Sequence, residues 1–191
     1  MNLLHIDSSA LGTKSASREL TATIVAQLRE NHPTARVTYR DLDSAPLPHL
    51  TGAALAGADQ AATAVADAVL AEFLAADVVV IGAPMYNFSI PSTLKAWIDR
   101  IAVAGKTFRY GPNGAEGLAG RKRVIVASTR GGVYGNGAMD FQENYLRAVL
   151  GFLGVTDISF ARAEGLAMSG SDRAQKLRAA STAVEPLALA A

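Results

Sequence analysis

Five short apolar runs alternate along the chain with longer segments in which apolar residues recur every three or four positions. Residues 78–83 are apolar throughout, as is typical of a strand buried on both faces of a parallel sheet. Further strands are predicted over residues 2–7, 37–42, 124–128 and 155–163. Residues 37–42 form a shorter and more polar segment than the other predicted strands, which favours a place at the edge of the sheet.

Helical spacing fills the segments between these strands. Leu20, Ile24 and Leu28 lie four residues apart and predict a helix over residues 17–30. Similar spacing predicts helices over residues 61–75, from Pro91 to about residue 101, over residues 145–153 with Gly154 as a stop, and from about Ser171 to Pro186. Residues 108–120 are expected to form a long irregular loop, and the alanine-rich tail is expected to fray.

Five strands that alternate with five helices predict an α/β fold in one domain over residues 1–191. The expected architecture is a three-layer sandwich: a five-stranded parallel sheet with helices on both faces and the common strand order 2-1-3-4-5. In such sheets ligands bind beyond the carboxyl ends of the strands, where the strand order reverses. Three loops should meet there, at residues 8–17, 84–91 and 128–132.

The composition narrows the chemistry expected at that edge. The chain has no cysteine and three scattered histidines, which excludes thiolate chemistry and argues against a metal site. A formal net charge of +1 without basic blocks argues against nucleic-acid binding. No uncharged apolar run reaches about 18 residues, and the start lacks the pattern of a signal peptide, so we expect no membrane span and a cytoplasmic location.

The first of the three loops is rich in hydroxyl groups and leads into a helix. A helix N-terminus offers free N–H groups and a partial positive charge, which together suit a phosphate. One simpler interpretation is that a serine only caps the helix. The chain contains neither the phosphate-loop nor the dinucleotide glycine pattern, which argues against nucleotide hydrolysis. The phosphate candidates are Ser9, Ser15, Ala16 and Ser17, with Lys14 and Arg18 as additional cations.

The second loop, Pro84-Met85-Tyr86-Asn87-Phe88, suits a flat heteroaromatic ring, because amides can match ring polar atoms while the other side chains give apolar faces. A rigid turn with its aromatic residues in the core would explain Phe88 well but Asn87 poorly. The third loop, Thr129-Arg130-Gly131-Gly132, lets a ligand approach its two glycines closely. Together the three loops predict a mononucleotide with a broad ring, and FMN fits that description.

The second loop is followed by Leu-Lys-Ala-Trp-Ile-Asp at residues 94–99, and the chain also contains Thr107-Phe108-Arg109-Tyr110 and Ala163-Glu164-Gly165. In these motifs and their order, the chain resembles the FMN-dependent NADH-azoreductases, within the flavodoxin-like quinone reductases. The resemblance implies a flavodoxin-like fold, non-covalent FMN, NADH or NADPH as co-substrate, and a homodimer with active sites at the interface. It also implies a ping-pong reduction of quinones and azo compounds.

By the same resemblance, FMN phosphate contacts are expected at Ser9, Ser15, Ala16 and Ser17, and ring contacts in the second and third loops, with Pro84 included in the second. The flavin N5 would accept the hydride, so no catalytic acid or base side chain is expected. Phe108, Tyr110 and Tyr134 are candidate aromatic walls for the acceptor.

Two other functions fit the same predicted fold. A flavodoxin-type electron carrier would pass single electrons to protein partners, although such carriers usually need a charged docking surface and this chain is near neutral. A binding module would hold a ligand without NADH turnover, because a fold by itself does not determine function.

Overall fold

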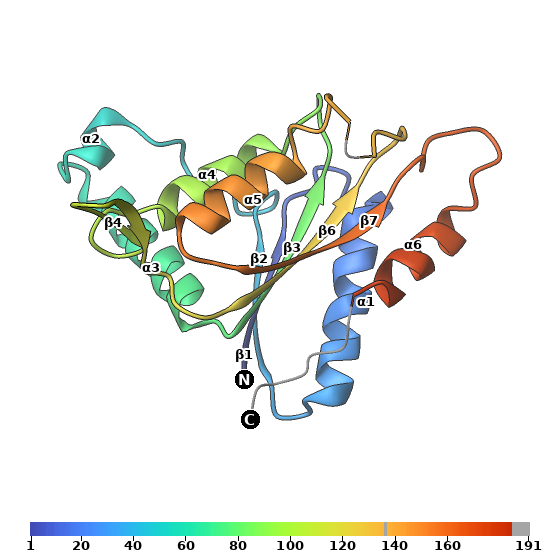
Figure 1. Ribbon diagram of the computed structural model, residues 1–191, viewed down its shortest axis with the longest axis horizontal. Helices are drawn as coiled ribbons and strands as arrows, with labels where there is room; N and C mark the ends of the chain where they lie inside the picture. The colour runs from blue at the N-terminus through green and yellow to red at the C-terminus, as the bar shows by residue number, and fades with distance from the viewer. Residues whose placement is uncertain (136, 185–191) are drawn as a thin grey trace.

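The computed structural model describes residues 1–135 and 137–184. One sheet holds five strands, and a separate hairpin holds two (Figure 1). The strands of the sheet are β1 (Asn2–Asp7), β2 (Arg36–Asp41), β3 (Val78–Pro84), β6 (Arg123–Thr129) and β7 (Asp157–Ala163), and those of the hairpin are β4 (Phe108–Gly111) and β5 (Gly114–Gly117).

The described helices are α1 (Ala16–Asn31), α2 (Gly52–Leu55), α3 (Gln60–Ala75), α4 (Ser92–Ile101), α5 (Glu143–Phe152) and α6 (Arg173–Thr182), with a 3₁₀ turn, η1 (Gly12–Lys14), ahead of α1. Five of the described helices follow the predicted spacing closely, whereas α2 and the turn η1 were not predicted. In the described part of the chain, no helix combines the length and the apolar character that crossing a membrane requires. The predicted helix end near Pro186 and the tail beyond it lie outside the described residues.

The sheet is parallel throughout, with the order β2-β1-β3-β6-β7. This is the predicted order 2-1-3-4-5 once the hairpin strands are set aside, so the predicted topology is confirmed. β3 lies at the centre and is buried along its whole length, whereas β2 forms an edge and is largely exposed. Both results match the predictions from the apolar and polar patterns.

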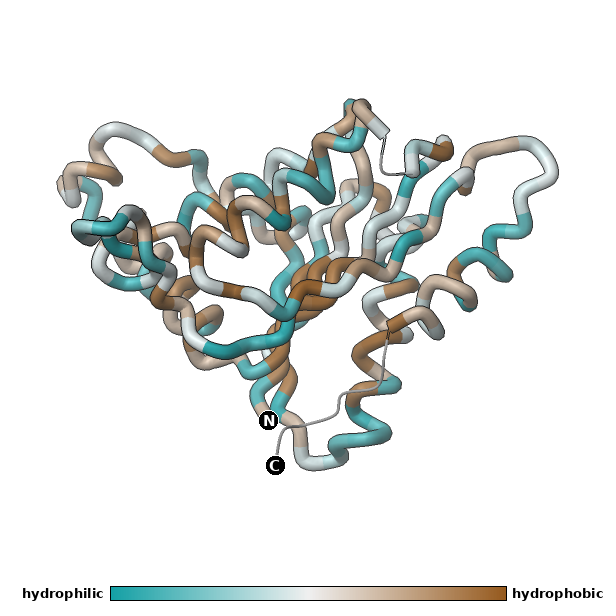
Figure 2. Tube along the Cα trace, in the orientation of Figure 1, coloured by the Kyte–Doolittle hydropathy of each residue, from teal (hydrophilic) through white to brown (hydrophobic). Residues whose placement is uncertain are grey.

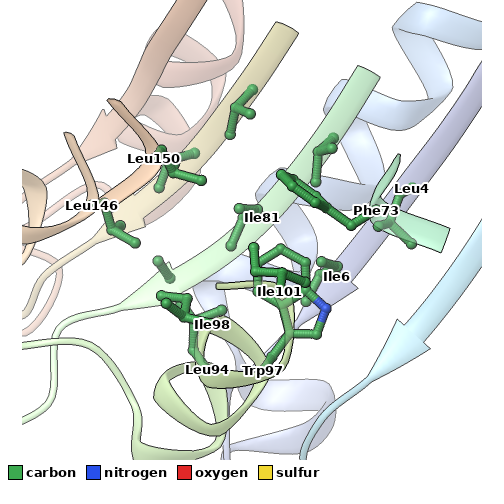
Figure 3. Close-up of a cluster of buried hydrophobic side chains, with 14 of the residues drawn as sticks. Leu4, Ile6, Phe73, Ile81, Leu94, Trp97, Ile98, Ile101, Leu146 and Leu150 are labelled. Carbon is green, nitrogen blue, oxygen red and sulfur yellow. The ribbon is translucent and has the colours of Figure 1, made fainter. Parts of the chain in front are cut away.

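Two apolar clusters lie on the two faces of the sheet, because successive residues of a strand point to opposite sides. Val79 and Ile81 pack with α3, α4 and α5, whereas Val80 packs with α1 and α6. Figure 3 shows the first cluster, in which the Phe73 and Trp97 rings meet edge to face with centroids 5.8 Å apart. Figure 2 shows that the most hydrophobic segments of the chain run through these central strands.

The prediction for residues 108–120 was wrong, because this segment contains the hairpin β4–β5 rather than an irregular loop. The hairpin is held by tertiary contacts that the local pattern does not encode. A Cβ atom on Gly117 would lie 2.1 Å from the backbone nitrogen of Gly154, and the Ala119 N–H donates to the Leu153 carbonyl. The glycines therefore allow the hairpin to pack directly against the end of α5, where Gly154 ends the helix as predicted with a φ of 94°.

Candidate functional site

The carboxyl ends of β1, β3 and β6 lie next to one another, at the upper edge of the sheet in Figure 1. Asp7 pairs with Gly82, and Pro84 pairs with Thr129, so the three predicted loops begin at neighbouring positions. The Met85 N–H donates to the Thr129 carbonyl at 2.8 Å and extends this pairing by one residue. The sheet register therefore brings together loops that are far apart in the sequence.

The first loop leads from β1 through η1 into α1. Ser15 caps α1, because its Oγ accepts the Arg18 N–H at 3.2 Å. The Ser9 hydroxyl lies 3.0 Å from the Tyr86 hydroxyl and so connects the first loop to the second. Among the described residues, the N–H groups of Ala16 and Ser17 donate to no protein atom, as expected in the first turn of a helix.

A cavity of about 250 Å³ opens at this helix N-terminus, and we call it the helix cavity. It contains the predicted phosphate residues Ser9, Ser15 and Ala16, whereas the buried Ser17 does not line it and shares a hydrogen bond with Ser15. The full lining is Ser9, Leu11, Lys14, Ser15, Ala16, Pro84, Met85, Tyr86, Thr129, Arg130, Gly131, Leu166, Ala167 and Arg173.

The positively charged side chains at the helix cavity are not the pair that the sequence predicted. Lys14 lines the cavity as expected, but Arg18 does not, because its guanidinium is bound to Asp41 and to the Ser9 carbonyl. Arg173, from α6, lines the cavity and was missed by the sequence analysis. It pairs with Glu19 of α1 at 2.6 Å. Only the packing of α6 against α1 brings it there, since about 150 residues separate the pair.

The second loop folds into a tight hairpin turn. Tyr86 and Ser89 exchange both backbone hydrogen bonds, at 2.9 and 3.1 Å. Asn87 and Phe88 between them have φ values of 50° and 69°, which is the pattern of a type I′ turn. Asparagine is favoured at the first of these positions, but a bulky aromatic residue at the second is strained. Backbone strain of this kind is concentrated at functional sites.

Phe88 is 42% exposed, so the alternative that its ring packs into the core is wrong. The strained turn instead presents the ring outward, where it meets the Tyr134 ring edge to face with centroids 5.9 Å apart. A second cavity of about 310 Å³, which we call the ring cavity, is lined by Met85, Asn87, Phe88, Gly131, Gly132 and Tyr134. Met85 and Gly131 line both cavities, so the two are adjacent and share a wall.

The third loop contributes its backbone rather than its charged side chain. The Arg130 guanidinium is completely buried and binds Asp140, Glu143 and Glu164 at 2.7, 2.9 and 3.0 Å. A ligand can therefore reach only the backbone of Arg130. Among the described residues, the N–H groups of Gly131 and Gly132 donate to no protein atom and are available to a ligand.

Two of the three predicted acceptor walls lie elsewhere in this chain. Phe108 and Tyr110 belong to the β4–β5 hairpin and line neither cavity. The Phe108 ring packs with Phe152 at the end of α5, and the Tyr110 ring meets Phe108 edge to face. Tyr134 is the third, and it does line the ring cavity. Phe108 and Tyr110 could therefore line an acceptor site only if a second copy of the chain brought its ring cavity next to them.

The ion pair beneath the first loop fixes its geometry. Hydrogen bonds from Arg18 lower the pKa of Asp41 to about 2, despite partial burial. Burial raises the pKa of Asp7, but the His5 side chain and hydrogen bonds from neighbouring hydroxyl groups outweigh this effect and lower it. Both carboxylates are therefore stabilised in their charged form, and they hold Arg18 against the Ser9 carbonyl.

We expect low pH to break the ion pair between Arg18 and Asp41, because the Asp41 carboxylate becomes protonated. The folded-state pKa of Asp41 lies below the ordinary value of 3.8, so its stabilisation is present above about pH 4 and is lost as the pH falls towards 2. The loss should be on the order of 2 kcal/mol in the free energy of unfolding. Urea unfolding from pH 7 to pH 2 would measure it. Asp41→Asn should remove this part of the pH dependence, whereas the more exposed Asp43→Asn should retain it.

We also expect Phe88→Gly to stabilise the fold by about 0.5–1 kcal/mol, because glycine adopts the positive φ of this position without steric cost. The same change should weaken binding of a flat ring, because it removes an aromatic wall of the ring cavity. Thermal unfolding and ligand titration would measure the two effects. Asn87→Gly is the matched control, and its stability should change little because asparagine already suits its position. A loss of stability in Phe88→Gly would show that the backbone at this position is not strained.

The fold and this edge define the class of the protein: an α/β protein of the flavodoxin-like type with a five-stranded parallel sheet, and with two cavities at the switch point between β1 and β3. The sequence profile of a family described as having a flavodoxin-like fold matches residues 1–187. The chain is 66% identical over 180 residues to FMN-dependent NADH:quinone oxidoreductase 1 of Xanthomonas axonopodis pv. citri, covering 94% of this chain and 93% of the relative.

Solved structures agree with this sequence relationship. An azoreductase from Bacillus anthracis str. Sterne is 31% identical, with a TM-score of 0.85 and 95% of both chains covered. An FMN-dependent NADH-azoreductase from Bacillus anthracis str. Ames Ancestor, solved in complex with FMN, is 27% identical with the same TM-score and coverage. The chain therefore belongs to the family of FMN-dependent NADH:quinone oxidoreductases and azoreductases.

The residues present suit FMN, the cofactor that this family implies. The helix cavity offers hydroxyl groups, free N–H groups at a helix N-terminus and Lys14, a donor set that matches a phosphate. The ring cavity offers aromatic and thioether faces together with the free N–H groups of Gly131 and Gly132. An anion site and a flat apolar site that share a wall fit the two ends of one mononucleotide.

Proposed function

We propose that this protein is an FMN-dependent NADH:quinone oxidoreductase that also cleaves azo compounds reductively. The observation that carries the proposal is that the helix cavity and the ring cavity share a wall, in a chain 66% identical to an oxidoreductase of that name. The proposal treats residues 1–191 as a single FMN-binding domain in the form of a three-layer sandwich. The two core clusters on opposite sides of the sheet support this arrangement.

We assign the phosphate end of FMN to the helix cavity and the ring to the ring cavity. Ser9, Ser15 and the N–H groups of Ala16 and Ser17 bind the phosphate, and Lys14 offsets its charge. Residues 84–88 and 129–132 surround the ring, with Arg130 contributing its backbone. Ser17 thus acts through its N–H group and through Ser15, to which its hydroxyl is hydrogen-bonded.

When bound, FMN would supply the redox chemistry by passing two electrons from one NADH to a quinone, whereas cleavage of an azo compound to two amines takes four electrons and therefore two NADH. The protein binds and orients both reactants. The ring cavity is lined by the side chains of Phe88 and Tyr134 and has no carboxylate or imidazole among its lining residues, so it suits flat, uncharged acceptors. Asn87 and the Gly131 and Gly132 N–H groups are preorganised donors for negative charge at the ring edge.

NADH and the acceptor would both bind against Phe88 and Tyr134 in the small ring cavity. Shared use of this site supports a ping-pong order, in which the oxidised nicotinamide leaves before the acceptor binds. Steady-state rates at several fixed NADH concentrations would test this order. Parallel double-reciprocal lines are expected, and intersecting lines would contradict it.

The decisive experiment is an absorbance spectrum of the purified protein, followed by anaerobic titration with NADH. We expect a bound flavin that bleaches on mixing and regains its colour with benzoquinone. Protein that is colourless and does not bind added FMN would refute the proposal. A flavin that NADH bleaches only slowly would instead favour the alternative, a flavodoxin-type electron carrier.

Replacement of Asn87 by alanine tests the ring assignment. Loss of one amide hydrogen bond at the ring edge should weaken FMN binding about tenfold, because such bonds contribute roughly 0.5–1.5 kcal/mol. Quenching of FMN fluorescence by the apoprotein would measure the affinity. Asn144→Ala, on α5 outside both cavities, is the matched control. Wild-type affinity and turnover in Asn87→Ala would show that the loop is only a turn.

A homodimer is part of the proposal. It is supported by large apolar side chains that stay exposed beside the ring cavity and in the segment that follows the third loop, namely Phe88, Val133, Met139 and Phe141. Sedimentation equilibrium of the holoprotein would give its mass, and a monomer at micromolar concentration would contradict this part. The cytoplasmic location stays a prediction, which cell fractionation would test.

A further inference from the structure

Glu164 occupies a position that the assigned cofactor contacts do not use. It follows the last residue of β7 and projects towards the third loop. Its Oε1 accepts three hydrogen bonds, from the Tyr134 N–H, the Gly135 N–H and the Arg130 guanidinium, each at 3.0 Å. The side chain is only 16% exposed. A single, partly buried oxygen thus connects the start and the end of the loop at residues 130–135.

The backbone beside Glu164 strengthens the same connection. The Arg130 N–H donates to the Ala163 carbonyl, and the Arg130 carbonyl accepts the Leu166 N–H. Further along, the Gly132 carbonyl accepts the Gly165 N–H at 2.7 Å. The third loop is therefore paired along one side with the segment that follows β7. The carbonyl groups of the loop are satisfied, while the N–H groups of Gly131 and Gly132 stay available.

The other side of the loop is anchored through the buried Arg130 side chain. Gln142 accepts a hydrogen bond from Arg130 Nε and donates its amide to the Ala83 carbonyl at 2.7 Å. Asp140 accepts from Arg130 Nη2 at 2.7 Å. The network therefore spans from the carboxyl end of β3, where the second loop starts, to Glu164 at the end of β7.

Tyr134 is the residue through which this network reaches the ring cavity. Its N–H donates to Glu164, and its ring lies over Gly132, where a Cβ atom would come within 3.2 Å of two ring carbons and the hydroxyl oxygen. The same ring meets Phe88 edge to face. A shift of the 130–135 backbone would therefore move both the free N–H groups of the loop and one wall of the ring cavity.

We propose that Glu164 is a positioning residue for the ring cavity, one that fixes residues 130–135 so that the Gly131 and Gly132 N–H groups and the Tyr134 ring stand where the flavin and the acceptor need them. This inference rests on the proposed function and deepens it. Glu164 itself lines neither cavity, so it acts through the loop and not by direct contact with a ligand.

The test compares Glu164→Gln and Glu164→Ala with Glu116→Gln, a control in which another glutamate–arginine pair is lost from the exposed hairpin. Charge-assisted hydrogen bonds are about twice as strong as neutral ones. We expect Glu164→Gln to weaken FMN binding about tenfold and Glu164→Ala to weaken it further. The KM for benzoquinone should rise more than kcat falls, because the change loosens a binding wall. Glu116→Gln should match the wild type.

A second measurement needs no flavin. In the apoprotein, amide hydrogen exchange of residues 130–135 should be faster in Glu164→Gln than in the wild type, while exchange in the β4–β5 hairpin stays unchanged. If Glu164→Ala does not fold, Glu164→Gln decides the outcome. Unchanged exchange and FMN affinity in a folded Glu164→Gln, or lower thermal stability with unchanged affinity and KM, would overturn the positioning role. A wild-type protein that binds no FMN would instead refute the proposed function.

Discussion

Replacement of Ser15 by aspartate should lower the affinity for FMN about 100-fold or more while leaving helix α1 intact. Ser15 caps α1 and lines the helix cavity. Aspartate is as good a helix cap as serine, and its charge is favourable at a helix N-terminus, so the apoprotein should be at least as stable as the wild type. With FMN present, the carboxylate would face the phosphate in the same cavity, and like charges about 4–5 Å apart repel by about 3–4 kcal/mol at an effective dielectric constant near 20.

Ser15→Asn is the matched control for this prediction. Asparagine has nearly the shape of aspartate and caps helices equally well, but it carries no charge. We expect its FMN affinity to stay within about tenfold of the wild type, since one hydrogen bond is altered. Titration of the two apoproteins with FMN separates the charge effect from the steric one. Equal affinities for the aspartate and asparagine variants would show that the phosphate does not bind at this helix.

Replacement of Arg130 by methionine should lower the free energy of unfolding by about 3–5 kcal/mol, the largest effect on stability that we expect. The guanidinium is fully buried and binds three carboxylates, of which those of Asp140 and Glu143 are 2% and 4% exposed. Removing one member of such a network leaves buried charges without compensation. The third loop should lose its anchor as well, so FMN affinity should fall together with stability.

Denaturant unfolding would measure this loss, with Arg109→Met as the control. Arg109 also pairs with a glutamate, Glu116, but both side chains are more than half exposed. Exposed pairs contribute at most about 1 kcal/mol, so this variant should unfold almost as the wild type does. Similar losses in the two variants would contradict the argument from burial. The comparison also separates the structural importance of Arg130 from a direct ligand contact, which its buried side chain cannot make.

The fold was predictable because each element carries its own apolar pattern. Residues 78–83 had to be a buried central strand, and the polar second strand had to be an edge. The hairpin β4–β5 was not predictable, because its short strands are held by packing against Gly154 and by the Ala119–Leu153 hydrogen bond. No periodicity within residues 108–120 records a contact with residues that follow α5.

The candidate site was predictable in its loops but not in the roles of individual side chains. Loops that follow parallel strands must meet at one edge, so the topology alone placed the hydroxyl-rich, aromatic and glycine-rich segments together. Arg18 was predicted as a cation for the phosphate and Arg130 as a ring contact, yet both guanidinium groups bind carboxylates of the protein itself. Arg173 reaches the helix cavity only because α6 packs against α1.

The sequence by itself determined the alternation of strands and helices, the edge at which the three loops meet, and the residue types in those loops, because these follow from local periodicity and from the direction of parallel strands. The tertiary structure alone decided which charges are free. A guanidinium can bind a ligand only if no carboxylate of the protein already holds it, and the carboxylates that do so come from other segments of the chain. They are Asp41 for Arg18, and Asp140, Glu143 and Glu164 for Arg130.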